Sequence, residues 1–174
     1  RMIGRYVMTQ ANCQHEAVAN DPVGWAAYTM DSHNCGRYVV NGMVKNCGDV
    51  QIYLPKGKYN ISYRSITPQE YEAQNLLVPF CLSASHIAFG SIRMEPIYMV
   101  LGETCGLAAV EAINKHAGCV QEVDASVVMA RFAERDRTEN PTGDTASRCP
   151  DIYDNYFANL QRAKDLATGA RQAE

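Results

Sequence analysis

The sequence predicts an α/β protein in which an antiparallel sheet is followed by one returning strand and a long helix. Short segments of alternating polarity, separated by turn dipeptides, fill most of residues 1–74. A continuous apolar run, NLLVPF, follows at residues 75–80, and a helical pattern begins at Glu95. We therefore expect three regions, residues 1–74, 75–118 and 119–174, and an α+β arrangement when the chain stands alone.

The bulk composition indicates an ordinary globular protein. With 174 residues, 47% of them hydrophobic and 20% charged, the chain is long enough to bury one sizeable core. A formal net charge of -3 with scattered Lys and Arg gives no reason to expect nucleic acid as a partner. No apolar run approaches the roughly 20 residues that span a bilayer, and the start lacks an apolar signal core. We expect a soluble protein of the cytoplasm or periplasm, and because Arg1 leads directly into strand-like residues, a piece of a larger one.

Strands and turns account for the first region. Residues 1–10 read as one strand, and residues 11–24 as a polar loop before the strand WAAYTM. RYVV and MVKNC flank Asn41-Gly42, the commonest dipeptide of two-residue hairpin turns. In YNISYRSIT, at residues 59–67, apolar and polar side chains alternate as in a half-buried strand. This region is predicted to be antiparallel sheet.

A strand, a loop and helices account for the rest. NLLVPF has the composition of a strand buried on both faces, and residues 83–94 read as a loop. Pro96 suits the first turn of the long helix, and Gly118 suits its end. Asp124 is the expected N-cap of a second helix, and a third amphipathic helix is expected over residues 151–167.

The start of the long helix is the candidate binding site. Unpaired backbone amides and the helix dipole place partial positive charge there, which suits an anion or an electron-rich ligand edge. Just before it, Ser91 offers a hydroxyl, Gly90 allows close approach of the backbone, and Arg93 supplies a fixed positive charge. Such groups would stabilise negative charge on the N1/O2 edge of a reduced isoalloxazine ring. The alternatives are a surface ion pair for Arg93 and a local hydrogen bond for His86.

Three small residues of the long helix, Gly102, Gly106 and Ala109, fall on one face. An interior glycine costs a helix roughly 1 kcal/mol relative to alanine, so we expect this face to lie against something large, either a sheet or a cofactor. The simpler alternative is that the small residues let the helix pack on the strand at residues 75–80.

Seven cysteines at irregular spacing, without any CxxC, are expected to be reduced thiols rather than a disulfide framework. Cys13-x-His15 and His33-x-Cys35 supply a ligand composition that zinc accepts. A small metal-binding module is therefore one alternative for this chain.

The stretch NLLVPFCLSASHIAFGSIRMEPIYMVLGETCGLAAVEA closely resembles the C-terminal part of a family of bacterial FAD-dependent oxidoreductases. Many members of this family carry the label xanthan lyase, and the family is related to the flavoprotein subunit of heterodisulfide reductase. The preceding YTMDSHNCGRYVVNGMVKNCGDVQI and YNISYRSITP resemble the same family's substrate-side segment. The resemblance runs from about residue 1 to about residue 135.

The resemblance implies the C-terminal part of a glutathione-reductase-like fold, with residues 1–74 on the substrate side and residues 75–118 closing the flavin site. It also implies FAD and hydride transfer between a small organic substrate and flavin N5. His86 and His33 are the acid–base candidates, while Arg93 would stabilise the reduced ring or anchor an anionic substrate. The candidate cofactor residues are Ser83, Ser85, Ser91, Arg93, Met94 and Glu95, with Asp31 and Ser32 approaching from the substrate side.

Two features of such flavoproteins are absent from the sequence. No GxGxxG follows a strand, so the dinucleotide-binding Rossmann half is expected elsewhere in the same protein or in a partner chain. No CxxCxxC spacing is present, which argues against an iron–sulfur cluster. The alternatives are a non-catalytic truncated chain that binds no FAD alone, the metal-binding module, and the carbohydrate lyase that the family label names.

Overall fold

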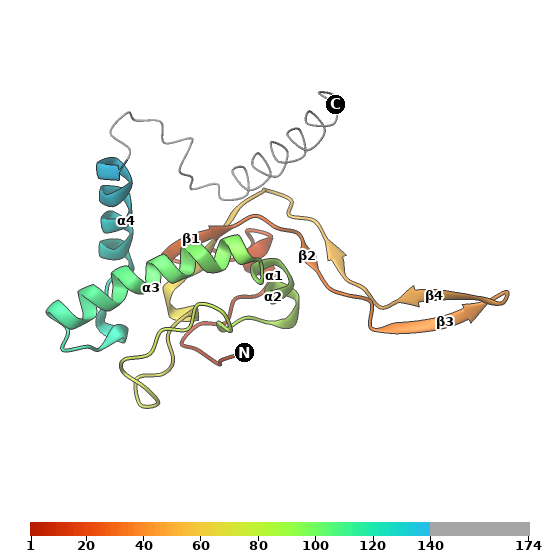
Figure 1. The fold of residues 1–174 in the computed structure, drawn as a ribbon, viewed down its shortest axis with the longest axis horizontal. Helices are drawn as coiled ribbons and strands as arrows, with labels where there is room; N and C mark the ends of the chain where they lie inside the picture. The colour runs from red at the N-terminus through yellow and green to blue at the C-terminus, as the bar shows by residue number, and fades with distance from the viewer. Residues whose placement is uncertain (140–174) are drawn as a thin grey trace, which may run out of the picture.

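A computed structural model describes residues 1–139 and shows helices packed around small antiparallel sheets (Figure 1). The predicted α/β class is confirmed, while the helix expected over residues 151–167 lies outside the described residues. The elements are α1 (Gln10–Cys13), β1 (Pro22–Ala26), β2 (Met30–Asp31), β3 (Gly36–Val40), β4 (Met43–Cys47), β5 (Gln51–Ile52), β6 (Tyr59–Ser62), the 3-10 turn η1 (Tyr63–Ser65), α2 (His86–Ile92), α3 (Glu95–Lys115), the 3-10 turn η2 (Val120–Glu122) and α4 (Ala125–Glu139).

The core forms where α3 and α4 cover the pair β1–β6. These two strands are antiparallel, with Gly24 opposite Ile61 and Ala26 opposite Tyr59. α3 packs on β1, and the buried Thr104 hydroxyl donates to the Val23 carbonyl at 2.8 Å. The alternation in the sequence therefore predicted β6 correctly, but the segment turns into η1 at Tyr63.

The strand predicted over residues 1–10 is wrong. Met8 forms a single parallel bridge with Ala84, and α1 begins at Gln10. The helix begins here because the Asn12 side chain accepts a hydrogen bond from the Thr9 amide at 2.9 Å, which satisfies an amide at the helix start. A local capping interaction thus replaces the expected continuation of the strand.

The hairpin predicted at Asn41-Gly42 is confirmed. β3 and β4 pair with Val40 opposite Met43, and the two loop residues have φ of 51° and 75°. Positive φ at both positions is the requirement of a type I′ turn. The hairpin extends away from the core (Figure 1) and exposes both of its faces. Its exposed large apolar residues are Tyr38, Val39, Val40, Met43 and Val44.

The strand predicted over residues 75–80 is also wrong. The segment has no regular structure, and the side chains of Leu76 and Phe80 are 45% and 64% exposed. A strand buried on both faces needs neighbouring strands and covering layers. The backbone hydrogen bond that ties this segment to the core runs from the Val78 amide to the Ile66 carbonyl at 2.8 Å. Phe80 stacks instead on the Tyr98 ring, with centroids 4.4 Å apart.

The loop predicted over residues 83–94 contains α2, and this part of the prediction is wrong. Ser85 caps the helix, since its hydroxyl accepts the Ala88 amide at 3.3 Å. The long helix is predicted correctly, with Pro96 in the first turn of α3 and Gly118, at φ +89°, just beyond its end. The short link Arg93-Met94 therefore joins two helices rather than a loop and a helix.

α3 is long and apolar enough, with a mean hydropathy of 1.3, to cross a membrane by length and composition alone. It packs instead on β1 and α4, and 44% of its apolar window is buried inside the protein. Its buried carboxylate, Glu111, contacts Lys115 at 3.1 Å and Arg131 of α4. We therefore interpret α3 as a core helix.

Candidate functional site

A pocket of about 350 Å³ lies between α2 and the ribbon that leads into the β3–β4 hairpin. It brings together three predicted catalytic residues, His33, His86 and Arg93, although more than fifty residues separate the first of them from the other two. The residues that line it are Asp31, Ser32, His33, Asn34, Cys35, Gly48, Val50, His86, Phe89, Gly90 and Arg93. We call it the α2 pocket.

Close packing of α2 on β2 forms one wall of the α2 pocket. A Cβ atom on Gly90 would lie 2.3 Å from the Asp31 carbonyl oxygen, so no side chain fits there. The next residue, Ser91, is fully buried; its hydroxyl donates to the Tyr28 carbonyl and accepts from the Tyr59 hydroxyl at 2.7 Å. Ser91 therefore holds α2 to the core, and its contact with a cofactor stays a prediction.

Arg93 occupies the junction between α2 and α3. One terminal nitrogen of its guanidinium lies 3.5 Å from the Asp31 carbonyl oxygen, which is the long limit of a hydrogen bond. Its Nε atom is buried and has no hydrogen-bond partner among the described residues. A buried charged donor without a partner is costly, so this side chain is suited to an acceptor that the chain does not supply.

The two imidazoles lie at the exposed rim of the α2 pocket. His86 is the first residue of α2, and His33 lies in the link between β2 and β3. Between them the ribbon is fixed by Ser32, whose hydroxyl accepts the Val50 amide at 2.9 Å. Asp31 accepts from the Tyr28 hydroxyl at 3.4 Å. Both histidines are accessible to a ligand and to solvent protons.

Five of the six predicted cofactor residues lie outside the lining of the α2 pocket: Ser83, Ser85, Ser91, Met94 and Glu95. Ser83 is buried, with its hydroxyl unpartnered among the described residues, and Ser85 caps α2. Met94 precedes α3 and Glu95 is exposed in its first turn. The geometry neither gathers them at one point nor excludes a cofactor larger than the pocket, so their roles stay predictions.

The start of α3 offers fewer amide donors than the sequence reasoning assumed. The Met94 carbonyl already accepts the amides of Ile97 and Tyr98, at 3.0 and 3.1 Å, and Pro96 has no amide hydrogen. Of the first-turn amides described, that of Glu95 is left for a ligand. At this end of the helix, the Arg93 guanidinium therefore offers a ligand more donors than the backbone amides do.

The described residues do not assemble the predicted Cys/His metal site. No group of three or more His, Cys, Asp or Glu residues among them is placed to hold a metal ion. Cys13 is instead a buried thiol whose pKa burial raises. The Cys35 thiol lies 3.0 Å from the Gly48 carbonyl oxygen and donates to it. The metal-binding alternative thus finds no ligand set in this part of the chain.

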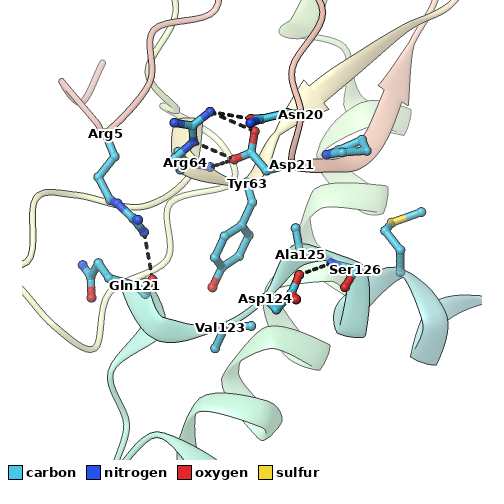
Figure 2. Close-up of a pocket in the computed structure, with 12 residues that line it drawn as sticks. Arg5, Asn20, Asp21, Tyr63, Arg64, Gln121, Val123, Asp124, Ala125 and Ser126 are labelled. Carbon is cyan, nitrogen blue, oxygen red and sulfur yellow. Dashed lines mark hydrogen bonds and ion pairs between the residues drawn. The ribbon is translucent and has the colours of Figure 1, made fainter.

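A second pocket, of about 500 Å³, lies at the start of α4 and was missed by the sequence reasoning (Figure 2). Arg64 lies 3.1 Å from the Asp21 carboxylate, whereas Arg5 donates to the backbone carbonyl of Gln121 at 3.1 Å. The one sequence signal for it was the cap residue Asp124, whose carboxylate accepts the Ser126 amide at 2.8 Å. Among the described residues, Arg5 and Asp124 of this pocket have hydrogen bonds to backbone groups but no oppositely charged partner.

The outer face of α3 is open. Five of its exposed residues, spaced three or four apart, form one apolar stripe, and Cβ atoms added to its two glycines would meet nothing within 4 Å. We call this stripe the α3 face; it comprises Met99, Gly102, Gly106, Val110 and Ile113. The sequence alternative in which the glycines pack on residues 75–80 is not what the structure shows. A groove of about 1,090 Å³ runs beside the α3 face and is bordered by residues 70–77.

The α2 pocket fits part of the cofactor that the resemblance implies. At about 350 Å³ it is at the small end of the roughly 300–1,000 Å³ of ligand pockets, and it cannot enclose a whole FAD. Its buried, unpartnered guanidinium nitrogen fits the polar edge of a flavin ring or an acidic substrate. The described residues thus fit the ring end of the cofactor and its substrate, and no GxGxxG is present for the ADP end.

The family model described as FAD dependent oxidoreductase matches residues 1–133. No curated protein and no solved structure matches the chain. The match includes every residue of the α2 pocket and the whole α3 face.

Proposed function

The chain belongs to the FAD dependent oxidoreductase family, and we propose that it forms the substrate-side, flavin-closing part of an enzyme that transfers hydride between a small organic substrate and FAD. The observation that carries this proposal is the α2 pocket, where residues from two distant segments meet directly before α3. The division into residues 1–74, 75–118 and 119–174 stays part of the proposal, as does the relation to proteins labelled xanthan lyase and to heterodisulfide reductase.

The residues of the α2 pocket have separate roles in this proposal. When bound, the flavin supplies the hydride-accepting or hydride-donating ring. His86 or His33 moves the substrate proton, since an imidazole can accept and donate a proton and both residues are exposed. Arg93 binds the charged edge of the ring or of the substrate, and Gly90 and Ser91 keep α2 at the distance that holds these groups together.

The α3 face supports the proposal that a Rossmann half completes the protein. The stripe exposes three large apolar residues side by side. Contiguous exposed apolar residues on a protein surface are typical of a contact site. The two glycines allow another backbone to approach closely. We assign this face to the dinucleotide-binding half, located in the same chain or in a partner chain.

FAD retention tests the proposed function. The chain alone is expected to lose the yellow cofactor during gel filtration, because its described residues fit only the ring end. The completed protein, in which the chain is combined with the dinucleotide-binding half that we assign to the same or a partner chain, is expected to retain FAD. In that protein His86→Gln or His33→Gln should lower kcat by about 10²-fold. Failure of the completed protein to hold FAD would favour the non-catalytic alternative, and full activity of both variants would remove the histidines from the mechanism.

A further inference from the structure

We infer that the α2 pocket binds a small monocarboxylic acid as substrate, with Arg93 as the anchor of its carboxylate. This inference rests on the proposed function, which leaves open whether Arg93 meets the flavin ring or the substrate. It names the substrate class of the same site.

The Arg93 guanidinium lacks a carboxylate partner among the described residues. Arg64 has a carboxylate partner in Asp21 and Arg131 has one in Glu111, whereas no carboxylate lies within 4 Å of the Arg93 guanidinium among the described residues. Its Nε atom is buried without a partner, and its one hydrogen bond, to the Asp31 carbonyl, is long. A guanidinium is always charged and presents a planar fork of donors, which matches a carboxylate.

The size of the α2 pocket suits a small organic acid. Its volume of about 350 Å³ equals that of about a dozen water molecules at roughly 30 Å³ each. A small organic acid fits inside this space, whereas a whole FAD would extend beyond it. The volume therefore allows a small substrate to bind in the pocket.

The charge of the other lining residues favours a ligand with a single carboxylate. Asp31 is the acidic residue in the lining, so a second negative charge on the ligand would be repelled. His33 and His86 lie at the rim, where a substrate that exchanges a proton needs them. One carboxylate near Arg93 and an uncharged remainder near the imidazoles suit Arg93 and both histidines, and a single charge limits the repulsion from Asp31.

Lactate and its neutral isostere lactamide test the inference on the chain alone, without flavin. Binding is measured by chemical-shift changes of the isotope-labelled chain. Lactate is expected to bind at least about tenfold more tightly than lactamide, because a charge-assisted hydrogen bond is lost in the amide. Arg93→Gln should weaken lactate binding by at least about tenfold. Arg37→Gln is the matched control, since Arg37 is exposed on the hairpin outside the α2 pocket.

Equal binding of lactate and lactamide, or equal binding by the Arg93→Gln and Arg37→Gln variants, would overturn the inference. If Arg93→Gln does not fold, Arg93→Lys takes its place: it keeps the charge, so it should keep the preference for lactate over lactamide, and loss of that preference on a folded Lys variant would count against the inference.

Riboflavin titration separates this inference from the proposed function. If Arg93→Gln weakens riboflavin binding and leaves lactate binding unchanged, Arg93 serves the flavin, and the inference fails while the proposed function stands. If lactate binding depends on Arg93 but the completed protein holds no FAD, the carboxylate site stands and the proposed function fails.

Discussion

Gly90 sets the distance between α2 and β2 and thereby the shape of the α2 pocket. In Gly90→Ala, the new Cβ would lie 2.3 Å from the Asp31 carbonyl oxygen, so α2 must shift. We expect the free energy of unfolding to fall by about 1–3 kcal/mol, as for other overpacked sites. Urea denaturation measures this change.

Gly106→Ala is the matched control for that substitution. It lies in α3 with nothing within 4 Å of the added Cβ, so the chain alone should gain roughly 1 kcal/mol of stability from the better helix former. Similar effects of the two substitutions would show that the close approach at Gly90 is not what limits the packing of α2.

Asp124 gives a pH-dependent contribution to stability. Its hydrogen bonds with Ser126 lower the pKa of its carboxyl group in the folded protein. The stabilisation is present above the unfolded pKa, near 4, and is lost as the pH falls through the lower native pKa. Asp124→Asn keeps a capping side chain without a charge, so its unfolding midpoint should fall less than that of the parent on acidification. Identical pH profiles of thermal unfolding would contradict this assignment.

At the scale of single elements, the β3–β4 hairpin depends on its turn. Gly42 has φ of 75°, and a Cβ added there meets nothing within 4 Å, so Gly42→Ala tests the backbone alone. A left-handed residue with a side chain costs roughly 1–2 kcal/mol, which an isolated two-stranded ribbon cannot absorb. We expect faster amide hydrogen exchange in the hairpin with an unchanged global unfolding midpoint. Global destabilisation would mean that the core depends on the hairpin.

Local signals explain which elements were predictable. The Asn41-Gly42 turn, Pro96 at the start of α3 and the cap at Asp124 depend on neighbouring residues, and the structure shows all three. α2 was missed because it spans seven residues with Gly90 inside, and its stability comes from tertiary contacts with β2. The run NLLVPF failed as a strand because burial on both faces requires partners that no local pattern specifies.

The residues of the candidate site were partly predictable from the sequence. The place of Arg93 before the long helix made it a candidate, the resemblance supplied His33 and His86, and the structure places all three at one pocket. The spacing of residues could not show the unpartnered guanidinium nitrogen or the occupied hydroxyl of Ser91, because both result from folding of the chain around α2. The second pocket depends on contacts between residues far apart in sequence, such as Arg64 with Asp21, and had no motif.

At the scale of the whole molecule, the α3 face is the surface that the account assigns to a missing half. Ile113→Asp places a charge on a side chain that is 71% exposed, so the stability of the chain alone should change by less than about 0.5 kcal/mol. In the completed protein the same charge would be buried against the Rossmann half and should reduce FAD retention during gel filtration. Asn114→Asp, at an exposed residue of α3 outside the α3 face, is the control. Equal FAD retention by both variants would remove the α3 face from the interface.

The most direct test of the central claim is a crystal structure of the completed protein with FAD bound. We expect the flavin ring to lie beside the start of α3, within reach of Arg93, with the α2 pocket opening onto the ring. A structure in which the start of α3 faces solvent, or in which the ring lies away from the α2 pocket, would contradict this expectation.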